Sequence, residues 1–333
     1  MGCNVAIAGV TGAVGQEFLR IIEERDFPFT SLKMLASSRS AGKKLEFKGK
    51  KYTIEEMTKN SFSGIDIALF SAGASRSKEF APAAVKAGAV VVDNSSAFRM
   101  DPTVPLIIPE INPQKIKENK GIIANPNCST IIGIVPVWPL HKANPVKRMV
   151  VSTYQAASGA GQSAMLELES QSRDILDGKK PTMKIFPYQI AFNVFSHNSD
   201  MLPNGYNQEE MKMVNETRKI FGCQSIAITC TCIRIPVFRA HCESINLEFT
   251  EAMTPEQVRD LLSTAPGVTV LDDRQHNRFP MPLDATGKDD IYVGRIRQDE
   301  SIPENRGINL WVSGDQLRKG AALNAIQIAE KML

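Results

Sequence analysis

Short apolar runs alternate with amphipathic stretches between residues 4 and 124. The apolar runs 4–9, 32–36, 65–71, 90–93 and 121–124 predict buried strands, and the stretches 16–24 and 80–87 predict helices between them. Strands that alternate with helices are typical of a parallel, doubly wound sheet. The pattern therefore predicts an α/β domain of Rossmann type over 1–127.

The pattern changes after residue 127. Segments 147–154, 225–234, 242–249 and 307–312 read as strands with polar alternation, and 162–177 reads as a helix. Long stretches with frequent Gly, Pro and Asn separate them, which favours an α+β domain with a mostly antiparallel sheet over 128–314. Apolar residues recur at helical spacing over 315–333 and predict a helix that completes the first domain.

The first predicted strand runs into a glycine-rich turn, Gly9-Val10-Thr11-Gly12-Ala13-Val14-Gly15. Glycines spaced by three between a strand and a helix match a dinucleotide-binding turn, in which the backbone approaches a pyrophosphate at the helix N-terminus. The second strand ends in Ser37-Ser38-Arg39-Ser40, without an acidic residue for the ribose of NAD. Hydroxyls and a guanidinium suit a 2′-phosphate, so NADP is the predicted cofactor; the alternative is a solvated loop with an ordinary surface arginine.

Composition and charge narrow the class of protein. The 333 residues include 39 basic and 36 acidic ones, a balance that argues against nucleic acid or an anionic membrane as partner. No apolar run reaches the roughly 18 residues of a transmembrane helix. The six cysteines form no Cys-x-x-Cys pair and the four histidines do not cluster, so no metal is predicted. Scattered thiols in a chain this long fit a reducing cytoplasm better than a disulfide framework.

Cys128 has the most suggestive context of the six cysteines. It follows Asn125-Pro126-Asn127 and precedes the apolar stretch 131–140, so it is expected at a turn that opens a helix. Backbone N–H groups at that position stabilise a thiolate. A buried structural thiol is the alternative, since free cysteine is often buried. Beside a nicotinamide domain, a reactive thiol suggests attack on a carbonyl group coupled to hydride transfer.

Such chemistry needs a proton carrier. His241 ends the stretch 234–241 just before a predicted strand and close to arginines, which makes it the best acid/base candidate. A structural or surface histidine is the ordinary alternative, and the sequence does not exclude His197. Cys242 remains a rival thiol, although Cys128 has the better setting at a helix start.

Several motifs together, in family order, resemble those of aspartate-β-semialdehyde dehydrogenases. Besides the glycine turn they lie at 93–99, 125–130, 154–161, 208–212 and 234–241, so the resemblance covers nearly the whole chain. It implies a fold like that of glyceraldehyde-3-phosphate dehydrogenase. It also implies the reversible, NADPH-dependent conversion of L-aspartyl-4-phosphate to L-aspartate-4-semialdehyde through a cysteine thioester, in lysine, threonine, methionine and diaminopimelate biosynthesis.

The resemblance implies a role for each matching residue. Cys128 matches the nucleophile, His241 the acid/base and Gln155 the residue that orients the substrate. The residues implied to bind the substrate carboxylate, its ammonium and its phosphate or carbonyl oxygens are, in that order, Arg234, Glu209, and Arg99 with Lys212 and Asn127. Without the resemblance, Glu209 and Lys212 would read as an ordinary pair on a solvated helix face.

The same resemblance implies the cofactor contacts and the assembly. The residues implied to contact NADP are Gly9, Thr11, Gly12, Ala13, Val14, Gly15, Arg39, Ser40, Ser158, Gly159 and Gln316. A homodimer or a dimer of dimers is expected. Two alternatives stay open: N-acetyl-γ-glutamyl-phosphate reductase, which would share the fold, the cysteine and NADPH, and a non-catalytic NADP-binding redox module, which would need no catalytic constellation.

Overall fold

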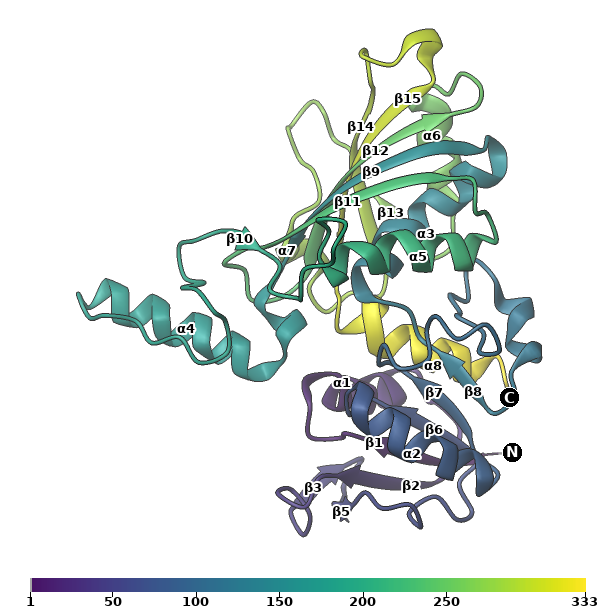
Figure 1. Ribbon diagram of the computed structural model, residues 1–333, viewed down its shortest axis with the longest axis vertical. Helices are drawn as coiled ribbons and strands as arrows, with labels where there is room; N and C mark the ends of the chain where they lie inside the picture. The colour runs from purple at the N-terminus through teal and green to yellow at the C-terminus, as the bar shows by residue number, and fades with distance from the viewer. Residues whose placement is uncertain (1) are drawn as a thin grey trace. The chain divides into compact units, whose positions relative to one another are not determined.

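The computed structural model describes residues 2–333, which divide into two compact units (Figure 1). The first unit comprises the residues up to Asn127 together with Ala321–Leu333, and the second comprises Cys128–Gly320. The chain therefore passes between the units twice, once after Asn127 and once after Gly320.

The first unit is built on a six-stranded sheet in the order β5-β2-β1-β6-β7-β8, and every pairing is parallel. One apolar cluster joins β1 and β2 to helices α1 and α8, and a second cluster joins the other face of β1 and β6 to α2. Because helices cover both faces, the central strands are apolar throughout. The elements are β1 (Cys3–Ala8), α1 (Ala13–Glu24), β2 (Phe29–Ala36), β3 (Lys44–Phe47), β4 (Lys50–Thr53), β5 (Glu55–Glu56), β6 (Ile67–Phe70), α2 (Ala74–Lys86), β7 (Val90–Asp93), the 3₁₀ turn Pro113–Glu118, β8 (Ile122–Ala124) and α8 (Leu323–Glu330).

Glycine is required at two positions of the turn between β1 and α1. Gly9 has a φ of 93°, and a Cβ there would lie 2.3 Å from the carbonyl oxygen of Ser71. A Cβ on Gly15 would lie 2.2 Å from the carbonyl oxygen of Gly9, so the helix packs directly on the turn. Gly12 is the N-cap of α1. The glycines thus bring the start of the helix close to the strand ends, as a dinucleotide-binding turn requires.

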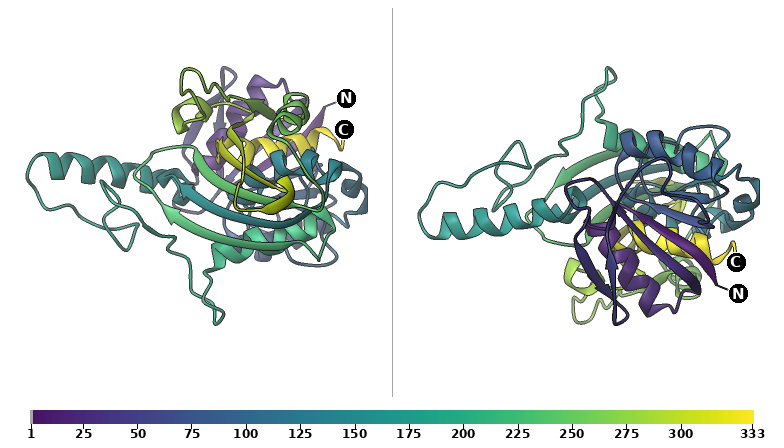
Figure 2. Two further views of the ribbon diagram at one scale, coloured as in Figure 1. Left: turned by 90° about the horizontal axis from the view of Figure 1, so that it is seen from above. Right: turned by 90° about the horizontal axis from the view of Figure 1, so that it is seen from below.

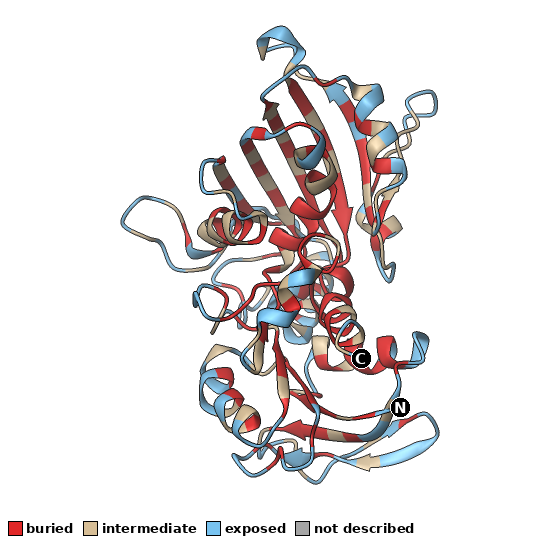
Figure 3. Cartoon of the chain, turned by 90° about the vertical axis from the view of Figure 1, so that its right-hand side faces the viewer, coloured by how far each residue is buried: buried red, intermediate tan, exposed pale blue. Residues whose placement is uncertain are grey.

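The second unit contains a seven-stranded sheet in the order β10-β11-β9-β12-β15-β14-β13. Four of its pairings are antiparallel, while β9–β11 and β13–β14 are parallel. The sheet is therefore mixed, and the prediction that most of its pairings are antiparallel is confirmed. Helices α3, α5 and α6 pack against one face. Buried and half-buried residues alternate along the strands, as Figure 3 shows, because only one face is covered by helices.

The elements of the second unit have these bounds: α3 (Cys128–Ala143), β9 (Val146–Gln155), the 3₁₀ turn Ala157–Ala160, α4 (Gln162–Leu176), β10 (Phe195–Ser196), α5 (Gln208–Phe221), β11 (Ala227–Arg234), β12 (His241–Phe249), α6 (Pro255–Ser263), β13 (Val268–Val270), α7 (Pro282–Ala285), β14 (Ile291–Gln298), the 3₁₀ turn Pro303–Asn305 and β15 (Gly307–Gly314). Helix α4 and the loop after it extend away from this sheet in both views of Figure 2.

The C-terminal helix begins later than predicted. Residues 315–317 are not helical; a π-helical turn, Arg318–Ala322, comes first and α8 follows it. The carboxylate of Asp315 explains the difference, since it accepts hydrogen bonds from the backbone N–H groups of Leu317 and Arg318 and from Arg239 Nε. These contacts hold the start of the predicted helix in the second unit. Among residues 2–333, none of the helices combines the length and apolar character needed to span a membrane.

Candidate active site

Cys128 is the first residue of α3 and lies beside a histidine. Its Sγ is 3.6 Å from His241 Nε2, and the histidine opens the neighbouring strand β12. Pro126 favours an extended backbone just before the helix, so the chain turns at Asn127 and the thiol stands at the helix start. A Cβ on Gly320 would lie 3.0 Å from Cys128 Cβ, which shows how closely the π-helical turn packs on the thiol residue.

The hydrogen bonds of His241 fix which ring nitrogen carries its proton. The ring is fully buried, and Nδ1 accepts a hydrogen bond of 3.0 Å from the backbone N–H of Ala156. The proton of the neutral ring is therefore on Nε2, which faces the sulfur of Cys128. Burial, and then the positive charge of Arg234, lower the pKa of His241 to about 3, so the ring is neutral near pH 7.

A chain of polar side chains continues from the thiol toward α5. Gln155, at the end of β9, donates from Nε2 to Ser129 Oγ and to Glu209 Oε1, the latter at 3.3 Å. Glu209 Oε2 accepts a hydrogen bond of 2.8 Å from Lys212 Nζ. Glu209 is buried, so this ion pair is not the solvated helix face that the sequence alone would favour.

Arg234 brings a second buried charge to this cluster. Its Nη2 donates to His197 Nε2 at 2.8 Å and its Nη1 to the Ala156 carbonyl at 3.3 Å, whereas Nε is buried without an acceptor among the described residues. Burial is the main effect on its pKa and lowers it. Gly159 leaves room for this side chain, because a Cβ there would lie 3.0 Å from Nη1. The open donor identifies a place for an anionic group.

The structure separates the candidates that the sequence left open. His197 is bound to Arg234, whereas His241 lies next to the thiol. Cys242 is buried against Ser313, and burial raises its pKa to about 11. Cys230 is buried with its sulfur 3.5 Å from that of Cys232, both as free thiols. Cys128 is thus the half-buried cysteine with a histidine neighbour.

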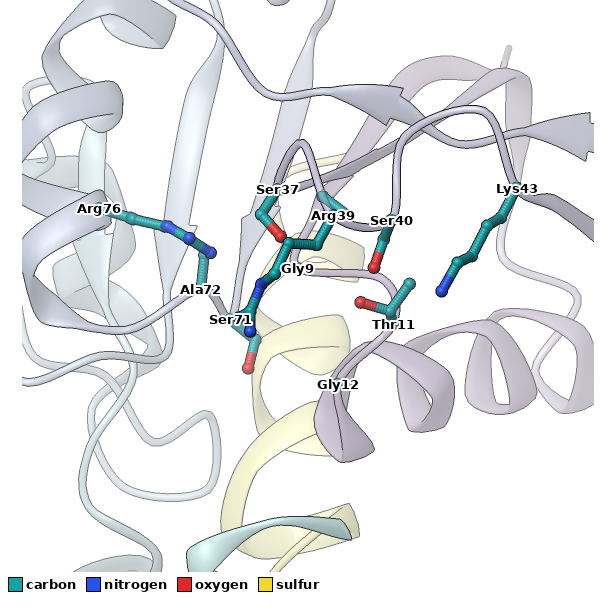
Figure 4. Close-up of a pocket in the computed structure, with 11 residues that line it drawn as sticks. Gly9, Thr11, Gly12, Ser37, Arg39, Ser40, Lys43, Ser71, Ala72 and Arg76 are labelled. Atoms are coloured by element: carbon teal, nitrogen blue, oxygen red, sulfur yellow. The ribbon is translucent and has the colours of Figure 1, made fainter. Parts of the chain in front are cut away.

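The first unit carries a separate cavity of about 380 Å³ next to the glycine turn (Figure 4). Five of the residues implied to bind the cofactor line it: Gly9, Thr11, Gly12, Arg39 and Ser40. Ala13, Val14 and Gly15 form the first turn of α1 just behind.

Sequence reasoning missed several residues of the same cavity. Arg76 from the first turn of α2, Lys43 and Ser71 also line it, so three cationic side chains surround the space. The position of Arg76 at the start of the helix after the third predicted strand could have indicated it. The C-terminal ends of parallel strands lie at one edge of the sheet, so residues just after them lie near the cofactor site.

Arg99 and Asn127 are both buried in the first unit. Arg99 donates from Nε to the Asn125 carbonyl at 2.9 Å and from Nη2 to the Asn94 carbonyl at 3.0 Å. The Asn125 amide donates to the Ala321 carbonyl at 3.2 Å. Arg99 therefore supports the segment that leads to Cys128, in addition to any contact with a ligand.

In the second unit, Gln316 and Ser158 are bonded to each other through their side chains. Gln316 Oε1 also accepts a hydrogen bond of 2.9 Å from the backbone N–H of Ala240. Both side chains are buried, so their orientation is fixed by the fold rather than by a ligand.

Comparison with known proteins agrees with this geometry. A model described as semialdehyde dehydrogenase, NAD binding domain, matches residues 4–119, and one described as semialdehyde dehydrogenase, dimerisation domain, matches residues 137–319. The aspartate-semialdehyde dehydrogenase of Synechocystis sp. is 57% identical over 330 residues, which cover 99% of this chain and 97% of that protein.

The chain belongs to the aspartate-semialdehyde dehydrogenase family. Two solved structures of relatives match it over their length. Aspartate semialdehyde dehydrogenase II from Vibrio cholerae, complexed with ASA, matches with a TM-score of 0.96 and 45% identity over 100% of this chain and 98% of that one. The enzyme from Candida albicans, with NADP, matches with a TM-score of 0.77 and 25% identity over 100% and 98%.

Membership in the aspartate-semialdehyde dehydrogenase family confirms the predicted fold and activity. The chain is an oxidoreductase of amino-acid biosynthesis, with a nicotinamide-binding domain and a dimerisation domain. Its reaction is the reversible reductive dephosphorylation of aspartyl phosphate to aspartate semialdehyde.

One buried acid of this family member lies outside the cluster at the thiol. Glu243 follows His241 by two residues on β12, so both side chains face α3. Its carboxyl group is fully buried, and both oxygens lack a hydrogen-bond partner among the described residues. Gly133 makes room for it, since a Cβ there would lie 2.5 Å from Glu243 Oε2. Burial raises its pKa well above the ordinary value, so the group stays protonated near neutrality.

We predict opposite pH dependences of unfolding for His241→Asn and Glu243→Gln. His241 binds a proton on unfolding between its folded pKa of about 3 and its ordinary value of 6.5, so it makes stability fall as the pH falls. Glu243 releases a proton on unfolding above its ordinary value of 4.5, so it makes stability fall as the pH rises. Between about pH 5 and 6.5, each removal changes the slope of the unfolding free energy by roughly 0.7 to 1.4 kcal/mol per pH unit.

Urea unfolding followed by tryptophan fluorescence measures these slopes, because both tryptophans, Trp138 and Trp311, belong to the second unit. The rise of stability with pH should be shallower in H241N and steeper in E243Q than in the wild type. Equal slopes in the three proteins would contradict the neutral state of both groups.

Proposed function

We propose that the chain carries out its reaction with NADPH through an acyl-thioester on Cys128. The observation that carries this proposal is the 3.6 Å approach of Cys128 Sγ to His241 Nε2, with Gln155, Glu209 and Arg234 gathered in the same unit. A thiolate at a helix start is a strong nucleophile, and a histidine that faces it with a protonated Nε2 can donate a hydrogen bond to it.

The proposed reaction proceeds in two stages. The Cys128 thiolate attacks the acyl carbon of aspartyl phosphate, the C–S bond forms, and phosphate leaves with the electron pair of the C–O bond. A reduced nicotinamide, when bound, would supply the hydride that reduces the thioester carbon. The resulting oxyanion then expels the thiolate and leaves aspartate semialdehyde. Throughout, His241 Nε2–H donates a hydrogen bond to the sulfur or to the substrate oxygen, and it does so as a neutral ring.

The charges of the site support an amino-acid substrate. The buried Arg234 Nε without an acceptor suits the α-carboxylate, and the Glu209 carboxylate suits the ammonium group. An N-acetylated amine has no charge, so the carboxylate of Glu209 favours aspartyl phosphate over N-acetyl-glutamyl phosphate. Lys212 of the second unit, and Arg99 with Asn127 of the first, are proposed to bind the phosphate.

The cavity of the first unit supports NADP as the cofactor. Arg39, Lys43 and Arg76 surround a space next to the glycine turn, and Ser37 and Ser40 also line it. Three cations suit the extra phosphate of NADP better than the ribose hydroxyl of NAD. The relative from Candida albicans was solved with NADP, which agrees with this choice. Ser158, Gly159 and Gln316 are proposed to contact the nicotinamide half.

We expect Cys128→Ala to abolish turnover of aspartate semialdehyde with phosphate and NADP, because no thioester can form. The affinity for NADP, measured by fluorescence titration, should stay within about threefold, since the glycine turn lies in the other unit. Cys242→Ala is the matched control, because that thiol is buried and has a raised pKa. Turnover in C128A near that of the wild type would refute the thioester.

Arg39→Ala should weaken NADP binding about tenfold or more and leave NAD binding nearly unchanged, because the guanidinium is proposed to contact the 2′-phosphate, which NAD lacks. The comparison of KM for NADP and for NAD measures the effect. Arg173→Ala on the exposed surface of α4 serves as the control. An equal loss for both cofactors would contradict the 2′-phosphate site.

The uncovered face of the large sheet supports a homodimer. Tyr154 on β9 and Trp311 on β15 are half-exposed on the two strands that flank β12, with ring centroids 5.3 Å apart, and Ser152, Ser244 and Asn246 continue the same face. Arg295 and Arg297 line the same surface beside Trp311, and aromatic residues and arginine are enriched at protein interfaces. The matching dimerisation-domain model agrees with this assignment. We propose that this face binds the same face of a second copy.

Trp311→Glu should convert the dimer to a monomer, because two opposed carboxylates would be buried at the centre of the interface. Size-exclusion chromatography with light scattering gives the mass of each protein. Met100→Glu, at an exposed apolar residue of the first unit, is the control and should stay dimeric. A wild-type mass of one chain would refute the interface.

A further inference from the structure

His197 lies beside the site but takes no part in the chemistry proposed above. It follows β10, and its backbone N–H donates to the Cys232 carbonyl at 2.8 Å. This bond holds the residue on β11, the strand that ends at Arg234. The side chain then turns to the guanidinium, where Arg234 Nη2 donates to His197 Nε2 at 2.8 Å.

The direction of this hydrogen bond fixes the state of the histidine. A guanidinium can only donate, so Nε2 must be the acceptor and the ring proton must be on Nδ1. Nδ1 lies 3.1 Å from Ser199 Oγ and 3.2 Å from the backbone nitrogen of Ser199. With the proton on Nδ1, the hydroxyl oxygen is the group that can accept it, and the backbone N–H does not donate to the ring. Burial, and then the charge of Arg234, lower the pKa of His197 to about 4, which agrees with a neutral ring.

Ser199 carries the connection to helix α5. Its Oγ accepts a hydrogen bond of 3.1 Å from the backbone N–H of Glu209 and donates one of 3.3 Å to Asn207 Oδ1. Asn207 is the N-cap of α5, and its Oδ1 also accepts from the Glu210 N–H. A continuous set of hydrogen bonds thus joins Arg234 to the first turn of the helix that carries Glu209.

We infer that His197 is a positioning residue that sets the direction of the Arg234 guanidinium and its spacing from Glu209. The inference rests on the proposed function, in which these two residues bind the carboxylate and the ammonium of one substrate. Both substrate groups are attached to one carbon, so their binding residues must keep a fixed separation. The link through His197 and Ser199 supplies that separation, because it anchors the arginine to the helix of the glutamate.

Two substitutions separate the two halves of this link. In His197→Gln the side-chain amide reaches the place of Nε2 and keeps an acceptor for Arg234. In His197→Asn the amide reaches only the place of Nδ1, so the contact with Ser199 can remain while the contact with Arg234 is lost. We expect H197N to raise KM for aspartate semialdehyde about tenfold or more, with kcat within about threefold, and H197Q to stay within about threefold of the wild type in both.

The assay uses the full-length protein with aspartate semialdehyde, phosphate and NADP. KM for phosphate and the affinity for NADP are the internal controls and should not change in either variant. A role limited to folding predicts a different result, because it would lower the amount of active enzyme in both variants and leave KM constant.

Alkylation of Cys128 provides a readout that does not depend on turnover. Iodoacetate carries a carboxylate that Arg234 can attract, whereas iodoacetamide is neutral. The ratio of their rates at Cys128, followed by peptide mass spectrometry, should fall about fivefold or more in H197N and remain near the wild-type ratio in H197Q. A wild-type protein that does not turn over aspartate semialdehyde would refute the proposed function, while this ratio would still test His197.

Three results would overturn the inference. The first is an unchanged KM together with an unchanged alkylation ratio in H197N. The second is an equal rise of KM in H197Q and H197N, because the acceptor for Arg234 would then be irrelevant. The third is a loss of apparent kcat at constant KM in both variants, which would limit His197 to folding or to proton transfer.

Discussion

The contact between Cys128 and Gly320 is the constraint on which the site depends. These residues are the first and the last of the second unit, and a Cβ at Gly320 would make a tight contact of 3.0 Å with Cys128 Cβ. On the other side of the two chain crossings, the Asn125 amide binds the Ala321 carbonyl and accepts from Asn324. The crossings are thus fastened to each other within each unit. Cys128 directly follows one crossing and Gly320 directly precedes the other, so their close packing ties the backbone at the thiol to both ends of the second unit.

Burial gives the groups around the thiol their chemical states. His241 is neutral because its charged form would be desolvated next to Arg234, and the Ala156 N–H directs its proton toward the sulfur. Gln155 donates hydrogen bonds to both Ser129 and Glu209. The last residue of β9 therefore holds the carboxylate that is proposed to bind the ammonium, and the next residue, Ala156, orients His241. In a medium of low dielectric constant such hydrogen bonds are stronger than in water, and an unpaired donor is costly. The open Nε of Arg234 therefore favours any ligand that supplies an anionic oxygen at that point.

The sequence indicates those parts of the fold and site that depend on local order along the chain. The strands of the first unit and the glycine turn follow from short apolar runs and from spacing, and the structure has them within a few residues. Apolar runs and spacing alone do not place Arg76 in the cofactor cavity or His197 against Arg234, because only the folded sheet and the return of the chain after α4 bring them there. The start of the C-terminal helix was predicted too early for a similar reason. The Asp315 carboxylate accepts hydrogen bonds from Arg239 and Gly287, which are distant in sequence, and from the backbone N–H group of Leu317.

Such a site rejects a wrong substrate mainly because its buried polar groups are then left without partners, and less because the right substrate is attracted more strongly. An aldehyde without the α-carboxylate would supply no anion to the buried guanidinium of Arg234. An aldehyde without the ammonium would supply no cation to Glu209, which would then accept hydrogen bonds from Gln155 and Lys212 but none from the substrate. Sites that are built to bind a polar group reject analogues that lack it far more strongly than apolar pockets reject a missing methylene. That rejection requires that the guanidinium cannot turn away to another acceptor. His197 prevents such a turn, because it already holds one edge of Arg234 and is itself tied to the helix of Glu209. Rigid placement of the arginine, rather than its charge alone, would then decide which acyl phosphates reach the thiol.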